Sequence, residues 1–286
     1  MQPVAVSSKL TDLSDVIRTM YLNKTVGVIV PAHNEAPSIT AVVNDLREQA
    51  AVDHIVVCDN ASHDATAKLA QMAGATVVRE PQKGYGAACL RALSVLPECD
   101  WIVFVDGDRA MRGSDLSQLL LALNDGAQLV IGSRTLGAQK GWVESGALTP
   151  HQRFGNWLAA KLSTWVWLRG TNQQVTDLGP YRAITQVALA QLEMQDKAYG
   201  WTMEMQAKAL AKSLPMVEVP VASLRRIGSS KVSGTWRGSL GAAVGILGAL
   251  MRIGAPALWA QLLQSITIKP REKEPQVSTL KWKKPS

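Results

Sequence analysis

The chain has 286 residues and a net charge of +7. Hydrophobic residues make up 47% and charged residues 19% of the sequence, which excludes a disordered or collagen-like chain. The length suits one large domain or two small ones with a sizeable core. Residues 1–218 carry 19 basic and 21 acidic side chains, whereas residues 219–286 carry 11 and 2. This basic last quarter predicts an anionic partner: a nucleotide, a nucleic acid or a membrane surface.

Cysteine content and apolar patterning indicate a cytoplasmic protein. The three cysteines, Cys58, Cys89 and Cys99, are too few and too scattered for a disulfide framework or a zinc ribbon. The first residues lack the pattern of a signal peptide. No apolar stretch reaches the roughly 20 residues that span a bilayer, so we expect no transmembrane helix.

Short apolar runs alternate with segments of helical spacing through the first half of the chain. We expect strands at 25–30, 54–57, 75–78, 101–105 and 129–131, with helices at 35–49, 65–73, 85–96 and 115–123. This alternation is typical of βαβ units, and uniformly apolar strands fit a sheet covered on both faces. The predicted fold class is therefore α/β, with a mostly parallel central sheet flanked by helices.

The pattern changes after residue 134. We expect a loop over 137–146, helices over 150–168 and 201–211, a strand over 216–222 and an apolar helix over 239–263. The last 20 residues are polar, basic and proline-bearing, which is typical of disorder. The predicted organisation is an N-terminal extension (1–24), a main domain (25–238), an apolar helical segment (239–266) and a basic tail (267–286).

Polar turns follow three of the expected strands. Glu35 comes after the first, Asp59 after the second, and Asp106 and Asp108 after the fourth. Ligands of parallel sheets bind at these carboxyl ends. The sequence contains no GxGxxG after the first strand and no GxxxxGK[ST], which argues against a dinucleotide enzyme and a P-loop NTPase.

Asp106 and Asp108, separated by Gly107, form the most informative of these turns. Two carboxylates behind a buried strand are costly to place together without a cation. Mg²⁺ or Mn²⁺ shared with a diphosphate would neutralise them, because hard cations take oxygen ligands. The alternative interpretation is a polar turn at a strand end.

The chain resembles family 2 glycosyltransferases in a series of ordered motifs. These are PAHNEA at 31–36, DNASHDAT at 59–66, DGD at 106–108 and GSR at 132–134. Later segments at 176–184, 199–206, 217–221 and 225–235 are similar to the branch of dolichyl-phosphate mannose and polyprenyl-phosphate glucose synthases. The resemblance covers residues 25–240 and implies a GT-A fold that transfers a hexose from a UDP- or GDP-sugar.

The resemblance also implies a set of donor-binding residues. These would be Pro31, Ala32, Asn34, Glu35, Asp59, Asn60, Lys83, Asp106, Gly107 and Asp108. The two DGD carboxylates would also bind the metal, although Ala110 replaces a glutamine that this branch often carries as a further ligand. Alternatively, Pro31 and Glu35 only mark the end of the first strand and the start of the following helix. Alternatively, Lys83 lies in a simple solvent-exposed turn that has no role in donor binding.

The acceptor decides which further residues are needed. A hydroxyl acceptor needs a general base, for which Asp177 and Glu204 are candidates. A phosphate monoester, with a second pKa of about 6, is already a nucleophile and needs cations to hold it. The candidate cations are Arg134, Arg153, Arg226 and Lys231. Alternatively, these cations are surface charges or pair with the two candidate bases. The expected catalytic residues are Asp108, Arg134, Asp177 and Glu204.

The apolar segment 239–266 and the basic tail fit a helix lying on an anionic membrane surface. Alternatively, the segment is a core helix or the contact of a homo-oligomer. Nucleic acid is not expected, because no recognition motif is present.

The sequence therefore predicts a metal-dependent, inverting glycosyltransferase, cytoplasmic or peripheral on the inner face of the membrane, with a polyprenyl phosphate acceptor. The alternatives are a soluble acceptor, such as a phosphorylated small acid or a sugar hydroxyl, or a non-catalytic nucleotide-sugar-binding protein. A nucleotidyltransferase is disfavoured, since no lysine- and glycine-rich loop follows the first strand.

Overall fold

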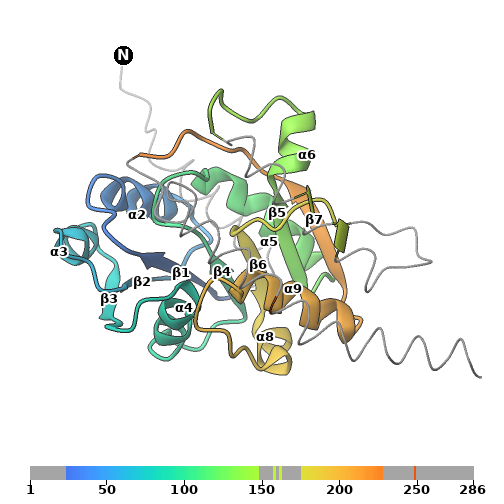
Figure 1. Cartoon of the computed structure of the whole chain (residues 1–286), viewed down its shortest axis with the longest axis horizontal. Coiled ribbons are helices and arrows are strands. Elements are labelled where there is room, and N and C mark those ends of the chain that lie inside the picture. The colour runs from blue at the N-terminus through green and yellow to red at the C-terminus, as the bar shows by residue number, and fades with distance from the viewer. Residues whose placement is uncertain (1–23, 148–156, 159–160, 163–174, 228–247, 249–286) are drawn as a thin grey trace, which may run out of the picture.

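A computed structural model describes residues 24–147, 157–158, 161–162, 175–227 and 248 (Figure 1). Four expected segments lie wholly or mostly outside these residues: the N-terminal extension, the helix 150–168, the apolar segment and the basic tail. No helix in the described part of the chain is long and apolar enough to cross a bilayer.

The described residues form one seven-stranded sheet in the order β3-β2-β1-β4-β6-β5-β7. The strands are β1 (Val26–Ala32), β2 (His54–Asp59), β3 (Thr76–Arg79), β4 (Trp101–Phe104), β5 (Leu129–Ser133), β6 (Arg182–Thr185) and β7 (Met216–Pro220). All neighbours pair in parallel except β6, which runs antiparallel to both β4 and β5. The predicted mostly parallel α/β sheet is confirmed.

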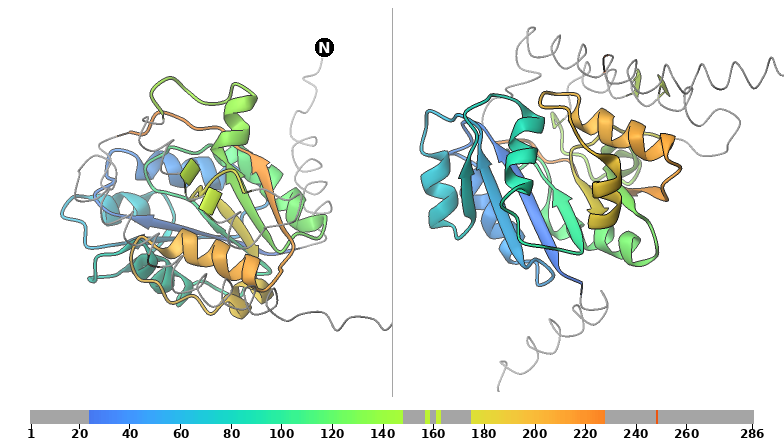
Figure 2. Two further views of the ribbon diagram at one scale, coloured as in Figure 1. Left: turned by 45° about the vertical axis from the view of Figure 1, so that its right-hand side comes forward. Right: turned by 90° about the horizontal axis from the view of Figure 1, so that it is seen from below.

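Helices cover both faces of this sheet (Figures 1 and 2). They are α2 (Ile39–Arg47), α3 (Thr66–Met72), α4 (Tyr85–Leu93), α5 (Leu116–Asn124), α6 (Arg134–Gln139), α8 (Gln186–Leu192) and α9 (Trp201–Ala211), with a 3₁₀ turn at Gly113–Asp115. Side chains of a strand point to alternate faces. Accordingly Val28 and Val30 of β1 pack with α2 and α5, whereas Ile29 packs with α4, α8 and α9.

Strand registers bring the carboxyl ends of the central strands together. Ala32, the last residue of β1, pairs with Asp59, the last residue of β2, and Ile29 pairs with Phe104 at the end of β4. Every residue of β1 and β4 is buried. The turns after β1, β2 and β4 therefore meet at one edge of the sheet, above an apolar core that holds them in place.

The structure differs from the sequence-based expectation in three elements. The first three residues of the expected loop 137–146 belong to α6, where the Ser133 hydroxyl accepts a hydrogen bond from the Leu136 amide at 3.2 Å and caps the helix. Strand β6 and helix α8 were not expected. The four residues of β6 carry a buried arginine, Arg182, so they lack the apolar pattern of a central strand.

Candidate functional site

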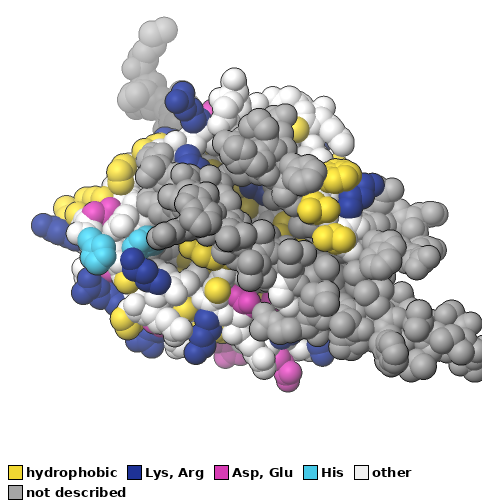
Figure 3. Space-filling model, viewed as in Figure 1, with side chains coloured by type: hydrophobic (Ala, Val, Ile, Leu, Met, Phe, Trp, Pro, Cys, Tyr) yellow, Lys and Arg dark blue, Asp and Glu magenta, His cyan; other side chains and the backbone are white. Residues whose placement is uncertain are grey.

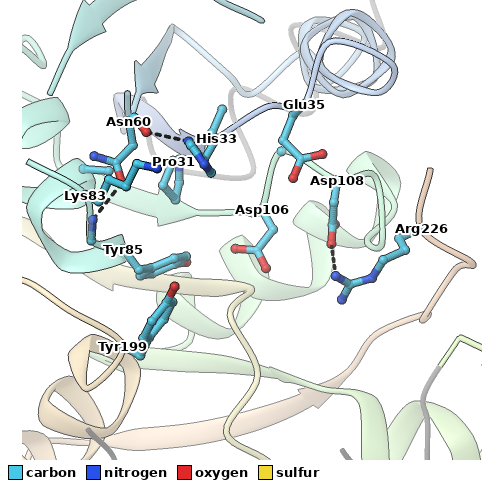
Figure 4. A pocket seen from close by; sticks show the side chains of 14 residues that line it. Pro31, His33, Glu35, Asn60, Lys83, Tyr85, Asp106, Asp108, Tyr199 and Arg226 are labelled. Carbon is cyan, nitrogen blue, oxygen red and sulfur yellow. Dashed lines mark hydrogen bonds and ion pairs between the residues drawn. The ribbon is translucent and has the colours of Figure 1, made fainter. Parts of the chain in front are cut away.

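A cavity of about 350 Å³ lies at the carboxyl ends of β1, β2 and β4 (Figure 4). Its lining comes from both halves of the chain, because the loop before α9 and the segment after β7 close it. The lining residues are Pro31, Ala32, His33, Glu35, Asn60, Lys83, Gly84, Tyr85, Ala88, Asp106, Gly107, Asp108, Tyr199 and Arg226. Eight of the ten predicted donor-binding residues are among them, and Asn34 and Asp59 are not.

Asn34 braces the loop after β1 against the loop after β2. The backbone amide of Asn34 donates to the Ser62 hydroxyl at 2.9 Å, and its side-chain oxygen accepts from the backbone amide of His63 at 2.8 Å. One residue later, the Glu35 amide donates to the Thr66 hydroxyl at 2.8 Å. These contacts between two strand ends fix the shape of the cavity wall.

Asn60 shapes the opposite wall. Its side-chain nitrogen donates to the Gln82 carbonyl at 2.7 Å, and its oxygen accepts from the Gly84 amide at 2.9 Å. These bonds fix the turn that carries Lys83 into the cavity. The neighbouring carboxylate of Asp59 is buried beside the cavity and makes a 3.1 Å ion pair with Arg79.

The DGD turn forms the floor of the cavity. The Ser38 hydroxyl donates to the Gly107 carbonyl at 2.8 Å. Asp108 is buried, and one of its oxygens accepts from the Ala110 amide at 2.9 Å while the other lies 3.3 Å from the Arg226 guanidinium. Asp106 Oδ1 is buried without a hydrogen-bond partner among the described residues.

The charge state of Asp106 reflects this environment. Burial, and then the negative charge of Asp108, raise its pKa to about 7, although Tyr85, Arg226 and Arg134 act in the opposite direction. The Tyr85 side chain is buried and points toward Asp106 in Figure 4, where a hydrogen bond from its hydroxyl lowers the pKa of Asp106.

These carboxylates fit a divalent cation. A buried, unpartnered carboxylate oxygen beside a second carboxylate is the donor set that Mg²⁺ or Mn²⁺ prefers. The described residues contain no cluster of three or more His, Cys, Asp or Glu side chains that could hold a metal by itself. Asp106 and Asp108 would therefore share the ion with donor phosphate oxygens and water, and Ala110 contributes only its backbone.

Removing the metal should expose a pH dependence of stability. Unfolded Asp106 loses its proton near 3.8, whereas the folded chain retains it up to about 7. Stability of the metal-free protein should therefore fall as pH rises between these values, because the folded state binds the proton more tightly. We expect the Tm of EDTA-treated protein to decrease between about pH 5 and pH 7.5, and Asp106→Asn to remove most of that decrease.

Differential scanning calorimetry at several pH values, with and without Mn²⁺, measures this effect. Asp125→Asn, which changes an exposed aspartate far from the cavity, is the matched control and should keep the wild-type slope. A wild-type slope in Asp106→Asn would contradict the prediction.

The predicted acceptor cations fall into three groups. Arg226 lines the cavity beside Asp108. Arg134 lies behind the cavity, where it makes a buried bidentate pair with Asp177 through two bonds of 2.8 and 2.9 Å. Arg153 and Lys231 lie outside the described residues. Arg134 thus forms the ion pair that was the alternative interpretation of this residue.

The charge of Arg134 nevertheless reaches Asp106 and Asp108. Burial lowers the pKa of its guanidinium, but Asp177, and then Asp106 and Asp108, outweigh burial and raise that pKa. Arg134 in turn lowers the pKa of Asp106. It therefore supplies positive potential to the cavity floor while bound to another carboxylate.

Both candidate general bases are occupied. The Asp177 carboxylate also accepts from the Arg134 amide at 2.8 Å. The Glu204 carboxylate accepts from the amides of Gln195 and Asp196, at 3.1 and 2.7 Å, and lies 2.8 Å from the Lys208 ammonium. Neither carboxylate lines the cavity.

Some cavity residues were missed by sequence reasoning. Tyr85 lies two residues after the predicted Lys83. The sequence therefore indicated this turn, but it gave no role to the Tyr85 side chain. Tyr199 comes from a loop more than 100 residues later in the chain, and no local pattern marks it. His33 was not assigned to the site from the sequence, but it lines the cavity, and its ring nitrogen lies 2.8 Å from the Asn60 carbonyl oxygen.

The chain matches a family model and is similar to several proteins. Residues 27–177 match the family described as Glycosyl transferase family 2. An uncharacterized glycosyltransferase of Mycobacterium tuberculosis is 34% identical over 220 residues, covering 75% of this chain and 93% of the relative. Polyprenol monophosphomannose synthase of Mycolicibacterium smegmatis is 30% identical over 230 residues, covering 73% of this chain and 81% of the relative.

A solved structure shares the fold. Glucosyl-3-phosphoglycerate synthase from Mycobacterium tuberculosis, in complex with Mn²⁺, UDP and glucosyl-3-phosphoglycerate, superimposes with a TM-score of 0.68 at 19% identity. The match covers 89% of this chain and 86% of that one, and it shows the GT-A fold. With the ordered motifs, the family match and the extent of the sequence relatives taken together, the chain belongs to glycosyltransferase family 2 and is a glycosyltransferase.

Proposed function

We propose that this glycosyltransferase moves a hexose from a UDP- or GDP-sugar to a polyprenyl phosphate, with inversion at the sugar carbon. One observation carries the choice of acceptor: both candidate bases, Asp177 and Glu204, are bound elsewhere, whereas Arg226 lines the cavity beside the metal-site carboxylates. A hydroxyl acceptor requires a base to take its proton. A phosphate acceptor does not, because it is largely dianionic at neutral pH.

Two further facts support the proposal. Relatives aligned over about three quarters of this chain include the mycobacterial polyprenol monophosphomannose synthase and an undecaprenyl-phosphate mannosyltransferase from Micrococcus luteus. In the space-filling view, Lys and Arg side chains border the side of the molecule where β3 and α3 lie, next to the histidines (Figure 3). Asp and Glu side chains lie among them in the same view, but the cavity itself is lined by Lys83 and Arg226, whose charges would attract an anionic donor.

The proposed reaction is a single displacement. An oxygen of the acceptor phosphate attacks the anomeric carbon as the bond from that carbon to the donor diphosphate breaks. The nucleoside diphosphate leaves with the bond electrons, so no proton must move in the displacement. A bound Mg²⁺ or Mn²⁺ would offset the charge that develops on the leaving diphosphate. Asp106 and Asp108 would hold that ion, and Lys83 at the cavity wall would lie near the donor.

Arg226 would position the acceptor. Its guanidinium already lies at 3.3 Å from Asp108 and is about one-third exposed, so it borders both the metal site and solvent. Guanidinium binds phosphate oxygens in a bidentate manner. When a metal takes over the neutralisation of Asp108, Arg226 would become available to the acceptor phosphate. This exchange would favour binding of donor and metal before acceptor.

A donor screen tests the proposal. UDP- and GDP-hexoses are incubated with Mn²⁺ and prenyl phosphate in detergent, and release of UDP or GDP is measured together with the glycolipid product. Free prenol, which has the same chain but no phosphate, is the matched acceptor control and should receive no sugar. Transfer to a phosphorylated small acid, with none to prenyl phosphate, would refute the lipid acceptor.

Replacing Arg226 with glutamine should weaken use of the acceptor. Loss of a charged phosphate contact predicts a kcat/KM for prenyl phosphate lower by about 10- to 100-fold. The neighbouring Arg225 has an exposed side chain, so Arg225→Gln is the matched control with near wild-type rates. Steady-state kinetics with varied prenyl phosphate measure the effect. Equal losses in both variants would contradict a specific role for Arg226.

A further inference from the structure

The start of helix α4 is bound by a loop from the second half of the chain. The Gly86 and Ala87 amides donate to the carbonyls of Ala198 and Lys197, at 3.1 and 3.0 Å. The first amides of a helix lack partners within the helix. Here carbonyls of the loop 193–200, which we term the docking loop, satisfy two of them. Two amides at this end of α4 are therefore bound by protein.

Glycine is required for this approach. A Cβ atom on Gly86 would lie 1.8 Å from the Asp196 carbonyl oxygen, and one on Gly84 would lie 2.0 Å from the Lys197 carbonyl oxygen. Both distances are far below any allowed contact. The segment that reads as a glycine-rich turn beside the donor is thus shaped by the docking loop.

Glu204 holds the docking loop from the other side. Its carboxylate is almost fully buried and accepts from the Gln195 and Asp196 amides at 3.1 and 2.7 Å. Lys208, one helical turn later, lies 2.8 Å from the same carboxylate and balances its charge. The Asp196 carboxylate then accepts from the Ala198 amide at 2.8 Å and tightens the turn.

Helix α9, which carries Glu204, is itself fixed to the sheet. Arg182 of β6 is fully buried and donates to the Thr202 carbonyl at 2.6 Å and to the Gln206 side chain at 3.1 Å. Glu204 therefore projects from a rigid support. The docking loop carries Tyr199, whose side chain lies beside that of Tyr85 in the cavity (Figure 4).

We propose that Glu204 is a positioning residue for donor binding and not the general base of the reaction. Its carboxylate clamps the docking loop onto α4, and the clamp sets Tyr199 from the loop together with Lys83 and Tyr85 from the start of α4. The inference rests on the proposed function, because it takes the cavity to be the site of a nucleotide diphosphate. It concerns the donor and is independent of the acceptor.

Equilibrium binding separates this role from catalysis. Calorimetric titration of UDP and of GDP in the presence of Mn²⁺ gives a Kd without turnover. We expect Glu204→Gln, which retains one accepting oxygen, to raise the Kd of the bound nucleotide about 3- to 10-fold and Glu204→Ala to raise it more than tenfold. Glu48→Gln makes the same chemical change at an exposed site after α2, outside the docking loop, and should leave Kd unchanged.

A steric variant breaks the same contact from the other partner. Gly86→Ala should raise the Kd as much as Glu204→Ala. Because both changes remove the same docking contact, the Kd of the double variant should be no higher than that of the weaker-binding single variant. Hydrogen exchange of the 195–198 amides should accelerate in each variant. Far-UV circular dichroism and Tm confirm that the compared variants are folded, and Glu204→Gln keeps the test valid if Glu204→Ala does not fold.

The outcomes are distinguishable. If Glu204→Gln binds nucleotide like wild type but loses more than about 100-fold in kcat, together with the basic arm of its pH–rate profile, Glu204 is the base and the inference is wrong. If wild type binds nucleotide and every docking variant binds it equally, the clamp has no role in donor binding and the inference also fails. If wild type binds neither UDP nor GDP with Mn²⁺, the proposed function fails first and the inference fails with it.

Discussion

Asp108→Asn is expected to lower the rate of sugar transfer by at least about a thousandfold, which corresponds to about 4 kcal/mol of transition-state stabilisation. Asp108 is buried in the DGD turn beside Asp106, whose Oδ1 has no hydrogen-bond partner among the described residues. With one of two carboxylates neutralised, the divalent ion would lose a ligand and its charge balance. The leaving diphosphate would then depart without the ion that offsets its charge.

Release of UDP or GDP, and Mn²⁺ binding followed by electron paramagnetic resonance, measure this prediction. Both signals should be lost together. Asp125→Asn, at an exposed position, should retain both. A variant with Asp108→Asn that transfers sugar at the wild-type rate, or a wild-type rate that survives exhaustive chelation, would show that transfer does not depend on this ion.

Asp177→Ala is expected to reduce the free energy of unfolding by about 3–5 kcal/mol. Asp177 is completely buried and makes bidentate bonds with Arg134, so its removal leaves an uncompensated buried guanidinium. The same carboxylate also accepts from the backbone amide at the start of α6. The loss is therefore structural, and it reaches the site because Arg134 supplies positive potential to Asp106.

Denaturant unfolding measures the loss as a lower midpoint with an unchanged m-value. The double change Arg134→Met, Asp177→Leu removes both charges, and it should recover part of the stability lost in Asp177→Ala, because no charge remains unpaired. Asp177→Ala with a wild-type midpoint but no transfer activity would instead identify Asp177 as a catalytic base and weaken the case for a phosphate acceptor.

Charge at the candidate site is balanced in two layers. The cavity layer contains Asp106, Asp108 and Arg226, whose charge balance would change on binding of the proposed metal and substrates. The layer behind it contains Arg134 paired with Asp177. Because Asp177 is completely buried and pairs with Arg134 through both of its oxygens, this layer would hold a fixed potential when the proposed ligands bind in the cavity.

Local sequence patterns predicted most of the sheet and the donor side of the site. Most residues of strands β1, β2, β4 and β5 are apolar, and Trp201–Ala211 has the bounds expected for α9. Turns after β1, β2 and β4 had to meet, since parallel strands place their carboxyl ends on one edge. This is why Glu35, Asn60 and Asp106 could be assigned to one cavity from sequence spacing and motifs.

Partner choice among charged side chains could not be predicted in the same way. Glu204 between two methionines looked like a carboxylate with a catalytic task, and Arg134 looked like an acceptor cation. Hydrogen bonds over long sequence separations decided otherwise: Arg134 meets Asp177 across 43 residues. Glu204 bonds to amides only eight and nine residues away, but these lie in a loop whose path no periodicity specifies.

The sequence by itself therefore determined the α/β class, the family and the edge of the sheet where the site lies, because apolar periodicity and strand-end motifs are local properties. Only the tertiary structure decided which cations and carboxylates face the cavity. It inserted antiparallel β6 between β4 and β5, and it brought the docking loop onto Gly84 and Gly86. Those contacts join segments about 100 residues apart, and their energies depend on burial and geometry that the linear order of residues does not contain.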